Sequence, residues 1–352
     1  MASIPTRTLA AYITAVGPPE NIQIGELPLP PLGTADVLVK TEALVVDPVD
    51  TYVRRGGRPP SFPYIIGRDL VGTVVATGGP AAGAFAAGER VWCNSLGTSG
   101  LQGSFAQYVV VPGDRLYHLP EGPTATEAVA TLHGGATAYL GLFARGSLQP
   151  GDTVLVGGAG GSVGSCVTQL AVAAGARVLA TAREDDFDWC RGIGASAVFD
   201  YHDTELARRI RDAAPAGVDM YWDTSGHHDL ELAISLLARH GTIVLMANGP
   251  ARPPLPVGPF YTRDATIVGF ALGGASTGDL AAAARLINRE LARGALKVRV
   301  GITLPLEHAA ESHRLVESGF RPGRVVVIPC VSSKRRWCPK VAAGGPEGRY
   351  RR

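Results

Sequence analysis

The stretch Thr153-Val-Leu-Val-Gly-Gly-Ala-Gly-Gly-Ser-Val-Gly164 decides the fold class that this sequence predicts. Its first half is an apolar run ending in glycine, typical of a short buried strand, and apolar residues then recur at helical spacing up to Gly175. The turn between them has the pattern of a dinucleotide-binding loop, with Ala159 at the position of the first glycine. Gly161 would let the backbone approach a pyrophosphate, and Gly164 would let the helix pack closely on the strand. The phosphates would lie at the positive end of the helix dipole.

The tip of the next predicted strand, residues 177–183, indicates which nicotinamide cofactor this turn binds. An NAD site usually places Asp or Glu there, about 20 residues past the glycines, to hold the ribose hydroxyls. Here Thr181 and Arg183 lie at the tip. A guanidinium pairs with a 2′-phosphate through two hydrogen bonds, whereas a carboxylate repels it, so the tip favours NADPH over NADH. The alternative is that Arg183 is a solvated loop residue and that Glu184 or Asp185 holds the ribose.

Length and composition predict a soluble enzyme with two domains. A chain of 352 residues, 46% of them hydrophobic, is long enough for two cores, and its 45 glycines and 26 prolines imply many turns. The formal net charge of +2 is too near neutral for a nucleic-acid surface. No apolar run reaches the roughly 20 residues of a membrane span, and the amino terminus lacks the features of a signal peptide. We therefore expect a cytoplasmic protein without nucleic-acid or membrane partners.

The cysteines indicate a reducing compartment. They are odd in number, scattered and without a C-x-x-C pair, which argues against a disulfide framework and against a structural zinc site. They are Cys93, Cys166, Cys190, Cys330 and Cys338.

The apolar pattern divides the chain into four parts. Residues 1–123 contain short apolar runs broken by glycine and proline, among them 105–111, and predict a mostly β domain. Residues 124–272 alternate between strand and helix patterns and predict a doubly wound parallel sheet. Residues 273–330 begin with a long helix and continue with strand and helix, and residues 331–352 form a basic segment that predicts a disordered tail. The helices expected from residue 124 onward are 127–132, 137–143, 206–213, 229–239 and 279–293, and the strands after residue 183 are 197–200, 218–223, 241–246 and 265–270.

Five short motifs accompany the glycine turn in a fixed order. They are Asp47-Pro-Val-Asp-Thr-Tyr-Val-Arg-Arg-Gly56, Gly67-Arg-Asp-Leu-Val-Gly72, Gly88-Glu-Arg-Val91, Gly103-Ser-Phe-Ala-Gln-Tyr108 and Gly323-Arg-Val-Val-Val-Ile328. With these motifs the chain resembles the medium-chain dehydrogenase/reductase superfamily, and within it the zinc-independent quinone oxidoreductase (zeta-crystallin-like) branch, from Leu9 to about Pro329. The resemblance implies an α/β fold in which a GroES-like, mostly β catalytic domain is followed by an inserted Rossmann domain, after which the chain returns to the first domain. It places the nicotinamide at the floor of the cleft between the two domains.

The resemblance also implies which residues contact the cofactor. It assigns Ala159, Gly160, Gly161, Ser162 and Val163 to the pyrophosphate, Thr181 and Arg183 to the 2′-phosphate, Tyr201 to the adenosine end, and Met246, Ala247, Phe270, Leu272 and Arg324 to the region of the nicotinamide. A second interpretation of Tyr201 is that it caps the strand before it. The strand around Ile267 often pairs across a two-fold axis in relatives, which implies a homodimer.

The positions of the zinc ligands in the alcohol dehydrogenases of this superfamily are occupied differently here. Where those enzymes have Cys and His-Glu, this chain has Asp47, and Arg68 with Asp69, while the third ligand position falls near Leu132 and His133. The lobe of four closely spaced cysteines is also absent. A catalytic zinc needs about three protein ligands of the N/S type, so we expect no metal. In that case we expect Arg68 and Asp69 to have a surface or ion-pair role and His133 to lie in a buried turn. The alternative is that Asp47, Asp69 and His133 together bind a metal.

Without a metal, hydride transfer depends on cofactor placement and hydrogen-bond donors. The resemblance places Tyr52 and Thr137 near the nicotinamide and the substrate carbonyl, where a hydroxyl can stabilise developing charge; otherwise Tyr52 is a core aromatic. Asp47 is the third candidate catalytic residue and stands where many relatives have Asn. Because an ionised carboxylate disfavours an enolate, Asp47 is protonated, faces elsewhere, or indicates another substrate class.

Three hypotheses follow. The first is an NADPH-dependent, zinc-independent reductase that passes hydride to a quinone or to the β-carbon of an α,β-unsaturated carbonyl. The second is a zinc-type alcohol dehydrogenase working in the oxidative direction. The third is a non-enzymatic, cofactor-binding interaction protein, because crystallin-type and RNA-binding roles are reported for members of this branch.

Overall fold

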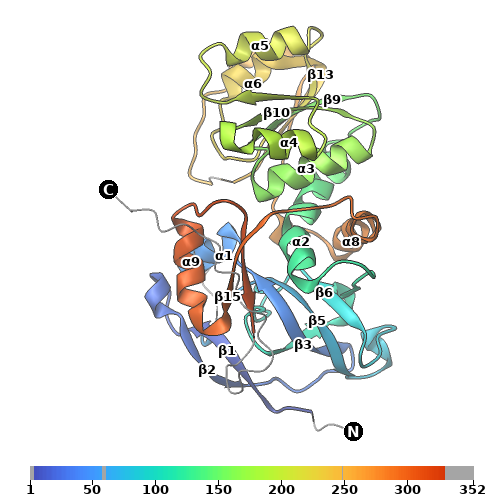
Figure 1. Cartoon of the computed structure of the whole chain (residues 1–352), viewed down its shortest axis with the longest axis vertical. Coiled ribbons are helices and arrows are strands. Elements are labelled where there is room, and N and C mark those ends of the chain that lie inside the picture. The colour runs from blue at the N-terminus through green and yellow to red at the C-terminus, as the bar shows by residue number, and fades with distance from the viewer. Residues whose placement is uncertain (1–3, 58–60, 248, 330–352) are drawn as a thin grey trace.

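Three sheets form the framework of the protein, seen in a computed structural model that describes residues 4–57, 61–247 and 249–329. The predicted tail, residues 331–352, lies outside the described residues. In Figure 1 the six-stranded sheet and its helices occupy the upper part of the molecule, and the two sheets built mainly from the first 120 residues occupy the lower part.

The six-stranded sheet forms around the glycine turn and confirms the predicted doubly wound fold. Its strand order is β11-β10-β9-β12-β13-β14, and all neighbouring strands are parallel. The order reverses between β9 and β12, and ligands bind at the carboxyl ends of the strands at such a switch point. The strands are β9 (Thr153–Gly157), β10 (Arg177–Ala182), β11 (Ala197–Asp200), β12 (Val218–Asp223), β13 (Leu237–Leu245) and β14 (Thr266–Gly269).

Both faces of this sheet are covered, because successive side chains of a strand point to opposite faces and here both sets are apolar. Val154 and Val156 of β9 belong to the same core as Cys166, whereas Leu155 belongs to a second core with Ile234. The helices of this part are α3 (Ser162–Ala173), α4 (Phe187–Gly192), α5 (Leu206–Ala213), α6 (Leu230–Leu236) and α7 (Val257–Tyr261).

The remaining sheets form the GroES-like domain. A three-stranded sheet has the order β2-β1-β4, and a seven-stranded sheet has the order β15-β16-β3-β5-β6-β8 with β7 paired to β3. Val326 of β16 pairs with Val45 of β3, so the end of the described chain joins the sheet that the first residues build. The strands are β1 (Arg7–Ile13), β2 (Gln23–Pro28), β3 (Asp36–Val45), β4 (Tyr64–Ile65), β5 (Asp69–Thr77), β6 (Arg90–Cys93), β7 (Tyr108–Pro112), β8 (Tyr117–His118), β15 (Val300–Pro305) and β16 (Arg324–Ile328).

Helix α2 (Ala125–Tyr139) corrects one prediction, because the two helices expected over 127–132 and 137–143 form one continuous element. It begins at a capping box, in which the backbone N–H of Glu127 donates to Thr124 Oγ1 and the backbone N–H of Thr124 donates to Glu127 Oε2. It continues directly into a π-helical segment, Leu140–Arg145. Gly134 and Gly135, which lie between the two expected helices, allow close contact with neighbouring helices.

Two further boundaries differ from the predictions. The helix expected over 229–239 ends at Leu236, where β13 begins, since the apolar run continues through both elements. The strand expected over 105–111 begins at Tyr108. The long helix expected over 279–293 is present as α8 (Thr277–Ala292).

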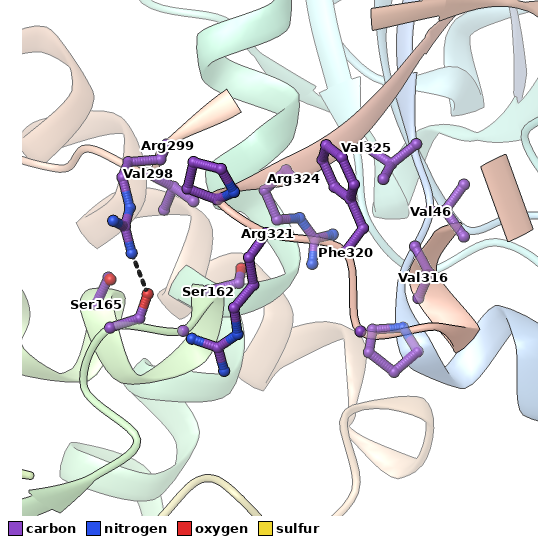
Figure 2. A pocket seen from close by; sticks show the side chains of 16 residues that line it. Val46, Ser162, Ser165, Val298, Arg299, Val316, Phe320, Arg321, Arg324 and Val325 are labelled. Atoms are coloured by element: carbon purple, nitrogen blue, oxygen red, sulfur yellow. Dashed lines mark hydrogen bonds between the residues drawn. The ribbon is translucent and has the colours of Figure 1, made fainter. Parts of the chain in front are cut away.

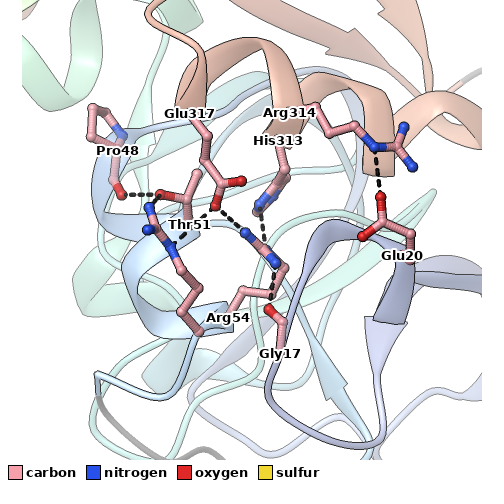
Figure 3. A network of polar contacts seen from close by, with 9 residues as sticks. Gly17, Glu20, Pro48, Thr51, Arg54, His313, Arg314 and Glu317 are labelled. Carbon is pink, nitrogen blue, oxygen red and sulfur yellow. Dashed lines mark hydrogen bonds and ion pairs between the residues drawn. The ribbon is translucent and has the colours of Figure 1, made fainter.

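A buried polar network fixes α9 (Ala309–Glu317) on α1 (Pro48–Arg54), as Figure 3 shows. The fully buried Arg54 donates to the carbonyl oxygen of Gly17, to Glu317, and to His313 Nδ1 at 3.3 Å. This network joins the returning end of the chain to its first helix. Within the described residues, no helix has the length and apolar character needed to span a membrane.

Candidate functional site

The glycine turn leaves the amino end of α3 open. Gly161 is the N-cap residue, and no side chain caps the helix. The first N–H groups of a helix have no acceptor inside it, so they are available to a ligand. A Cβ at Gly164 would lie 2.3 Å from the carbonyl oxygen of Gly158, which is the close helix–strand contact that the sequence predicts.

A cavity of about 260 Å³ lies beside this helix end, between the two domains. The glycine turn forms one side, and residues 319–325 form much of the other. Figure 2 shows that Arg299, Arg321 and Arg324 all line the cavity. Among the described residues, these three guanidinium groups share only two carboxylate partners, Asp186 and Asp47, and together with the helix amino terminus they offer hydrogen-bond donors to an anion.

The tip of β10 joins two of the predicted cofactor residues. Arg183 Nε donates to the hydroxyl oxygen of Tyr201 at 2.8 Å, and the Arg183 side chain is fully solvated. Arg183 is a cation, as arginine is at ordinary pH, and the hydrogen bond to the phenol raises its pKa further. Thr181 is buried, and its carbonyl oxygen accepts from the backbone N–H of Ala159.

The residues predicted near the nicotinamide follow the ends of β13 and β14. Met246 and Phe270 pack against the core, Leu272 is buried, and the Phe270 ring meets the Trp222 ring edge-on at 6.0 Å. Ala247 has a φ of +63°, a conformation in which a side chain is strained. These residues form an apolar wall beside the carboxyl edge of the sheet.

A cluster of buried charged residues joins four distant segments. Asp47 precedes α1, Asp69 begins β5, His133 lies on α2 and Arg324 begins β16. Arg324 Nη2 donates to Asp47 Oδ1, and His133 Nδ1 lies 3.5 Å from Asp47 Oδ2 and 3.7 Å from Asp69 Oδ1. The structure therefore brings together three residues of the alternative metal set and a predicted cofactor residue.

Arg68 and Asp50 extend this cluster. Arg68 Nε lies 3.2 Å from Asp50 Oδ1, and both side chains are buried. A surface role for Arg68 and Asp69 is therefore wrong, and Arg68 pairs with Asp50 rather than with its neighbour Asp69. His133 occupies a helix rather than a buried turn.

Mutual electrostatics set the protonation of the cluster. Burial raises the pKa of Asp47, but Arg324 and His133 outweigh it and hold this pKa below its usual value. Burial and the Asp47 charge raise the pKa of Asp69 to about 6 and that of Asp50 to about 7. Burial lowers the pKa of His133, but Asp47 and Asp69 reverse that effect and raise it. The cluster thus favours an ionised Asp47 between a guanidinium and a protonated imidazole.

The two hydroxyl residues predicted for catalysis lie on the helices that carry the cluster. Thr137 is buried on α2, four residues after His133 and therefore on the same helix face. Tyr52 lies on α1 and is 55% exposed, so it is not a core aromatic. Sequence reasoning missed Asp50, Asp186, Arg299 and Arg321. Asp50 lies in the quoted motif 47–56 and Asp186 follows Arg183 closely, whereas no quoted motif contains Arg299 or Arg321.

Two family models match the chain. Residues 33–121 match the alcohol dehydrogenase GroES-like domain, and residues 162–289 match zinc-binding dehydrogenase.

Known proteins are similar over nearly the whole described chain. A quinone oxidoreductase of Mus musculus is 29% identical over 91% of this chain and 97% of its own length. A mycobacterial protein solved in complex with NADPH has a TM-score of 0.79, is 28% identical and covers 92% of this chain and 100% of its own. A protein described as an NAD-dependent alcohol dehydrogenase has a TM-score of 0.81, is 30% identical and covers 91% of this chain and 99% of its own.

Proposed function

Because this chain belongs to the medium-chain dehydrogenase/reductase superfamily and is an oxidoreductase of that family, we propose that it is NADPH-dependent and zinc-independent and reduces a quinone or an α,β-unsaturated carbonyl. The observation that carries the proposal is the buried cluster of Asp47, Asp69, His133 and Arg324. It puts two cations beside the carboxylates at positions where zinc enzymes of the family hold a metal.

The residues of this cluster fit a zinc ion poorly. Asp47, Asp69 and His133 each offer a ligand atom within 4.8 Å of the others, and Asp47 Oδ2, both Asp69 oxygens and His133 Nδ1 have no hydrogen-bond partner. However, two carboxylates and one imidazole are not the N/S set typical of a catalytic zinc. The cluster also already contains cationic partners for these carboxylates, namely Arg68, Arg324 and a protonated His133. No step of the proposed reaction passes through a metal.

The bound cofactor supplies the hydride, and the residues of this chain position it. The open amino end of α3 receives the diphosphate, and Arg183, supported by Tyr201, pairs with the 2′-phosphate. The apolar wall of Met246, Phe270 and Leu272 excludes water from one side of the nicotinamide. This placement favours transfer of the hydride over its loss to solvent.

The acceptor oxygen needs a hydrogen-bond donor as negative charge develops on it. Thr137 and Tyr52 provide hydroxyl groups for this role, with Tyr52 free to approach a substrate from the exposed side. Asp47 is 1% exposed and directed at Arg324 and His133. It therefore faces away from the acceptor, and we assign it the positioning of Arg324 rather than contact with substrate.

We further propose that the protein is a homodimer that pairs through β14. This strand lies at the end of the sheet order, and unpaired edges invite association with another strand. Val257 and Tyr261 of the nearby α7 are 62% and 65% exposed. Light scattering of the purified protein measures its mass directly.

The cofactor proposal is tested by titrating the purified protein with NADPH and with NADH. Arg183→Ala is expected to weaken NADPH binding by about 10- to 100-fold and to leave NADH binding nearly unchanged, because one charge-assisted pair is lost. Arg191→Ala is the matched control, since Arg191 is also an exposed arginine of this region and is paired with Asp188. Equal weakening of both nucleotides by Arg183→Ala contradicts the assignment.

Turnover and metal content test the rest of the proposal. We expect NADPH oxidation with a quinone or an enone as acceptor, undiminished by chelators, and no stoichiometric zinc in the purified protein. Stoichiometric zinc together with alcohol oxidation would instead support the alcohol dehydrogenase hypothesis. Tight cofactor binding without turnover on either acceptor would support the non-enzymatic one.

A further inference from the structure

Asp186 and two arginines that line the cavity, Arg299 and Arg321, form a further group of charges. Asp186 ends a short 3-10 helix (Glu184–Asp186), three residues after Arg183, and its carboxylate is buried. Its Oδ1 accepts from Arg299 Nη2, and its Oδ2 accepts from Arg321 Nη1 at 3.0 Å. A Cβ at Gly160 would lie 2.5 Å from this carboxylate. A negative charge therefore lies beside the glycine turn, neutralised by two arginines of the returning segment.

Arg299 is held firmly in this group. Its Nη2 also donates to the carbonyl oxygen of Gly160 at 2.8 Å, and its guanidinium carbon lies 5.0 Å from the centre of the Trp189 ring. Trp189 is fixed in turn by its hydrogen bond to Ser165 Oγ. With a side chain only 25% exposed and three kinds of contact, Arg299 is an anchor that keeps Asp186 neutralised.

Arg321 is held much more loosely. Its side chain is 51% exposed, and Figure 2 shows it extending into the cavity in front of the glycine turn. Its ion pair with Asp186 is half solvated, and such pairs contribute little stability. A doubly charged diphosphate offers a guanidinium a stronger, bidentate partner. The exchange of one partner for the other is therefore favourable once an anion enters.

The same cavity has a second group ready for a ligand. Arg324 lines it, is 8% exposed, and has an Nε without a hydrogen-bond partner. Buried polar atoms are almost always hydrogen-bonded, so the Nε–H of Arg324 is available to donate to an acceptor on a ligand. Arg321 and Arg324 lie on the same wall of the cavity, opposite the amino end of α3.

We propose that Arg321 is a diphosphate-binding residue that pairs with Asp186 when no cofactor is bound. Cofactor binding then transfers Arg321 from Asp186 to the diphosphate. The inference rests on the proposed function, because it takes the cavity as the site of the dinucleotide. Asp186 thus competes with the cofactor for Arg321 and sets the affinity of the site. Since Asp186 belongs to the Rossmann part and Arg321 lies between α9 and β16, the exchange also transfers an interdomain contact to the cofactor.

The test compares Arg321→Gln and Asp186→Asn in the full-length protein. We expect Arg321→Gln to weaken NADPH binding by about 10- to 100-fold, because a charge-assisted pair is lost. We expect Asp186→Asn to tighten NADPH binding by about 3- to 10-fold, because the competitor for Arg321 and a nearby negative charge are removed. Arg145→Gln is the matched control, since Arg145 is a 42% exposed arginine paired with Asp279, outside the residues that line the cavity.

Probe ligands locate the effect on the molecule. Adenosine 2′-monophosphate lacks the diphosphate, whereas 2′-phospho-ADP-ribose contains it. Arg321→Gln should weaken the second probe as much as NADPH and leave the first unchanged, and in turnover it should raise the KM for NADPH more than it lowers kcat.

The outcomes separate this inference from the proposed function. If the wild-type protein binds NADPH but Arg321→Gln binds it equally well, or if both variants weaken binding alike, the inference is overturned and the proposed function stands. If the wild-type protein binds neither nicotinamide dinucleotide, both fail together. Opposite shifts for the two variants, with the effect of Arg321→Gln confined to diphosphate ligands, support the inference.

Discussion

His313 is a buried histidine that the fold keeps neutral. It is fully buried on α9, where Nδ1 accepts from Arg54 Nε at 3.3 Å (Figure 3). Its ring also makes a T-shaped contact with the ring of Phe105. Burial, with a smaller contribution from the Arg54 charge, lowers the pKa of His313 to about 3. A proton on this ring would place a second cation directly beside the Arg54 guanidinium in the core.

The consequence for stability follows from the sign of this shift. The folded pKa lies below the unfolded value of 6.5, so the unfolded state binds the proton first. The contribution of His313 to stability is complete above pH 6.5 and is lost as the pH falls from there toward 3. Each pH unit in that window removes about 1.4 kcal/mol. At about pH 5 the loss relative to about pH 7.5 is therefore about 2 kcal/mol.

The measurement must separate the effect of His313 on stability from that of buried carboxyl groups, which change stability in the opposite direction as the pH falls. Asp69 and Asp50, with pKa values of about 6 and about 7, gain protons in the folded state as the pH falls, which stabilises it over the same range. We therefore compare wild type with His313→Asn, in which the amide oxygen still accepts from Arg54. Urea unfolding at about pH 7.5 and about pH 5 should show wild type losing about 2 kcal/mol more than the variant.

A control and a clear refutation complete this experiment. His202→Asn removes an exposed imidazole, so the free energy of unfolding of this variant should depend on pH as that of wild type does. If His313→Asn and wild type show the same pH dependence, the His313 ring exchanges protons with solvent in the folded state, and the argument from burial is wrong.

Three further predictions concern the buried cluster, the glycine turn and a helix cap. Arg324→Leu should lower the free energy of unfolding by about 3–5 kcal/mol, because it leaves Asp47 buried without its guanidinium; adding Asp47→Leu should recover part of this in a double-mutant cycle, and additive losses would contradict the pairing. Gly164→Ala should lower the Tm and weaken NADPH binding, because the new Cβ would lie 2.3 Å from a carbonyl oxygen. Gly192→Ala is the control, because a Cβ at Gly192 meets nothing within 4 Å. Thr124→Ala should cost about 1 kcal/mol in urea unfolding by removing the cap of α2, and no measurable change would mean that the capping box is broken in solution.

The fold was largely predictable because its signals are local. The glycine turn, a strand–helix alternation and the doubly wound rule are enough to predict the parallel sheet, and the pairing of β9 with β10 and β12 follows that rule. The errors occur where local signals are ambiguous. Leu236 and Leu237 are both apolar, so the change from helix to strand between them leaves no mark in the sequence.

The site was less predictable because its contacts are not local. Asp47 and Arg324 are 277 residues apart in sequence, and Asp186 and Arg321 are 135 apart. A lone Asp or Arg is usually a solvated surface residue, and only the fold reveals that these are buried or face a cavity. Arg183 was recognisable because it replaces a residue at a known position of a motif, whereas Arg321 replaces nothing that a motif defines.

Burial decides which of the two arginine–aspartate pairs can exchange partners. In the Arg324–Asp47 pair the side chains are 9% and 1% exposed, and breaking such a pair costs about 3–5 kcal/mol. In the Arg321–Asp186 pair the arginine is 51% exposed, and pairs of that kind contribute about 0–1 kcal/mol. A diphosphate can therefore draw Arg321 away from its carboxylate while Arg324 keeps Asp47 and offers only its spare Nε. One arginine can move to the ligand because the other stays fixed, and the difference in exposure of their side chains is sufficient to assign these roles.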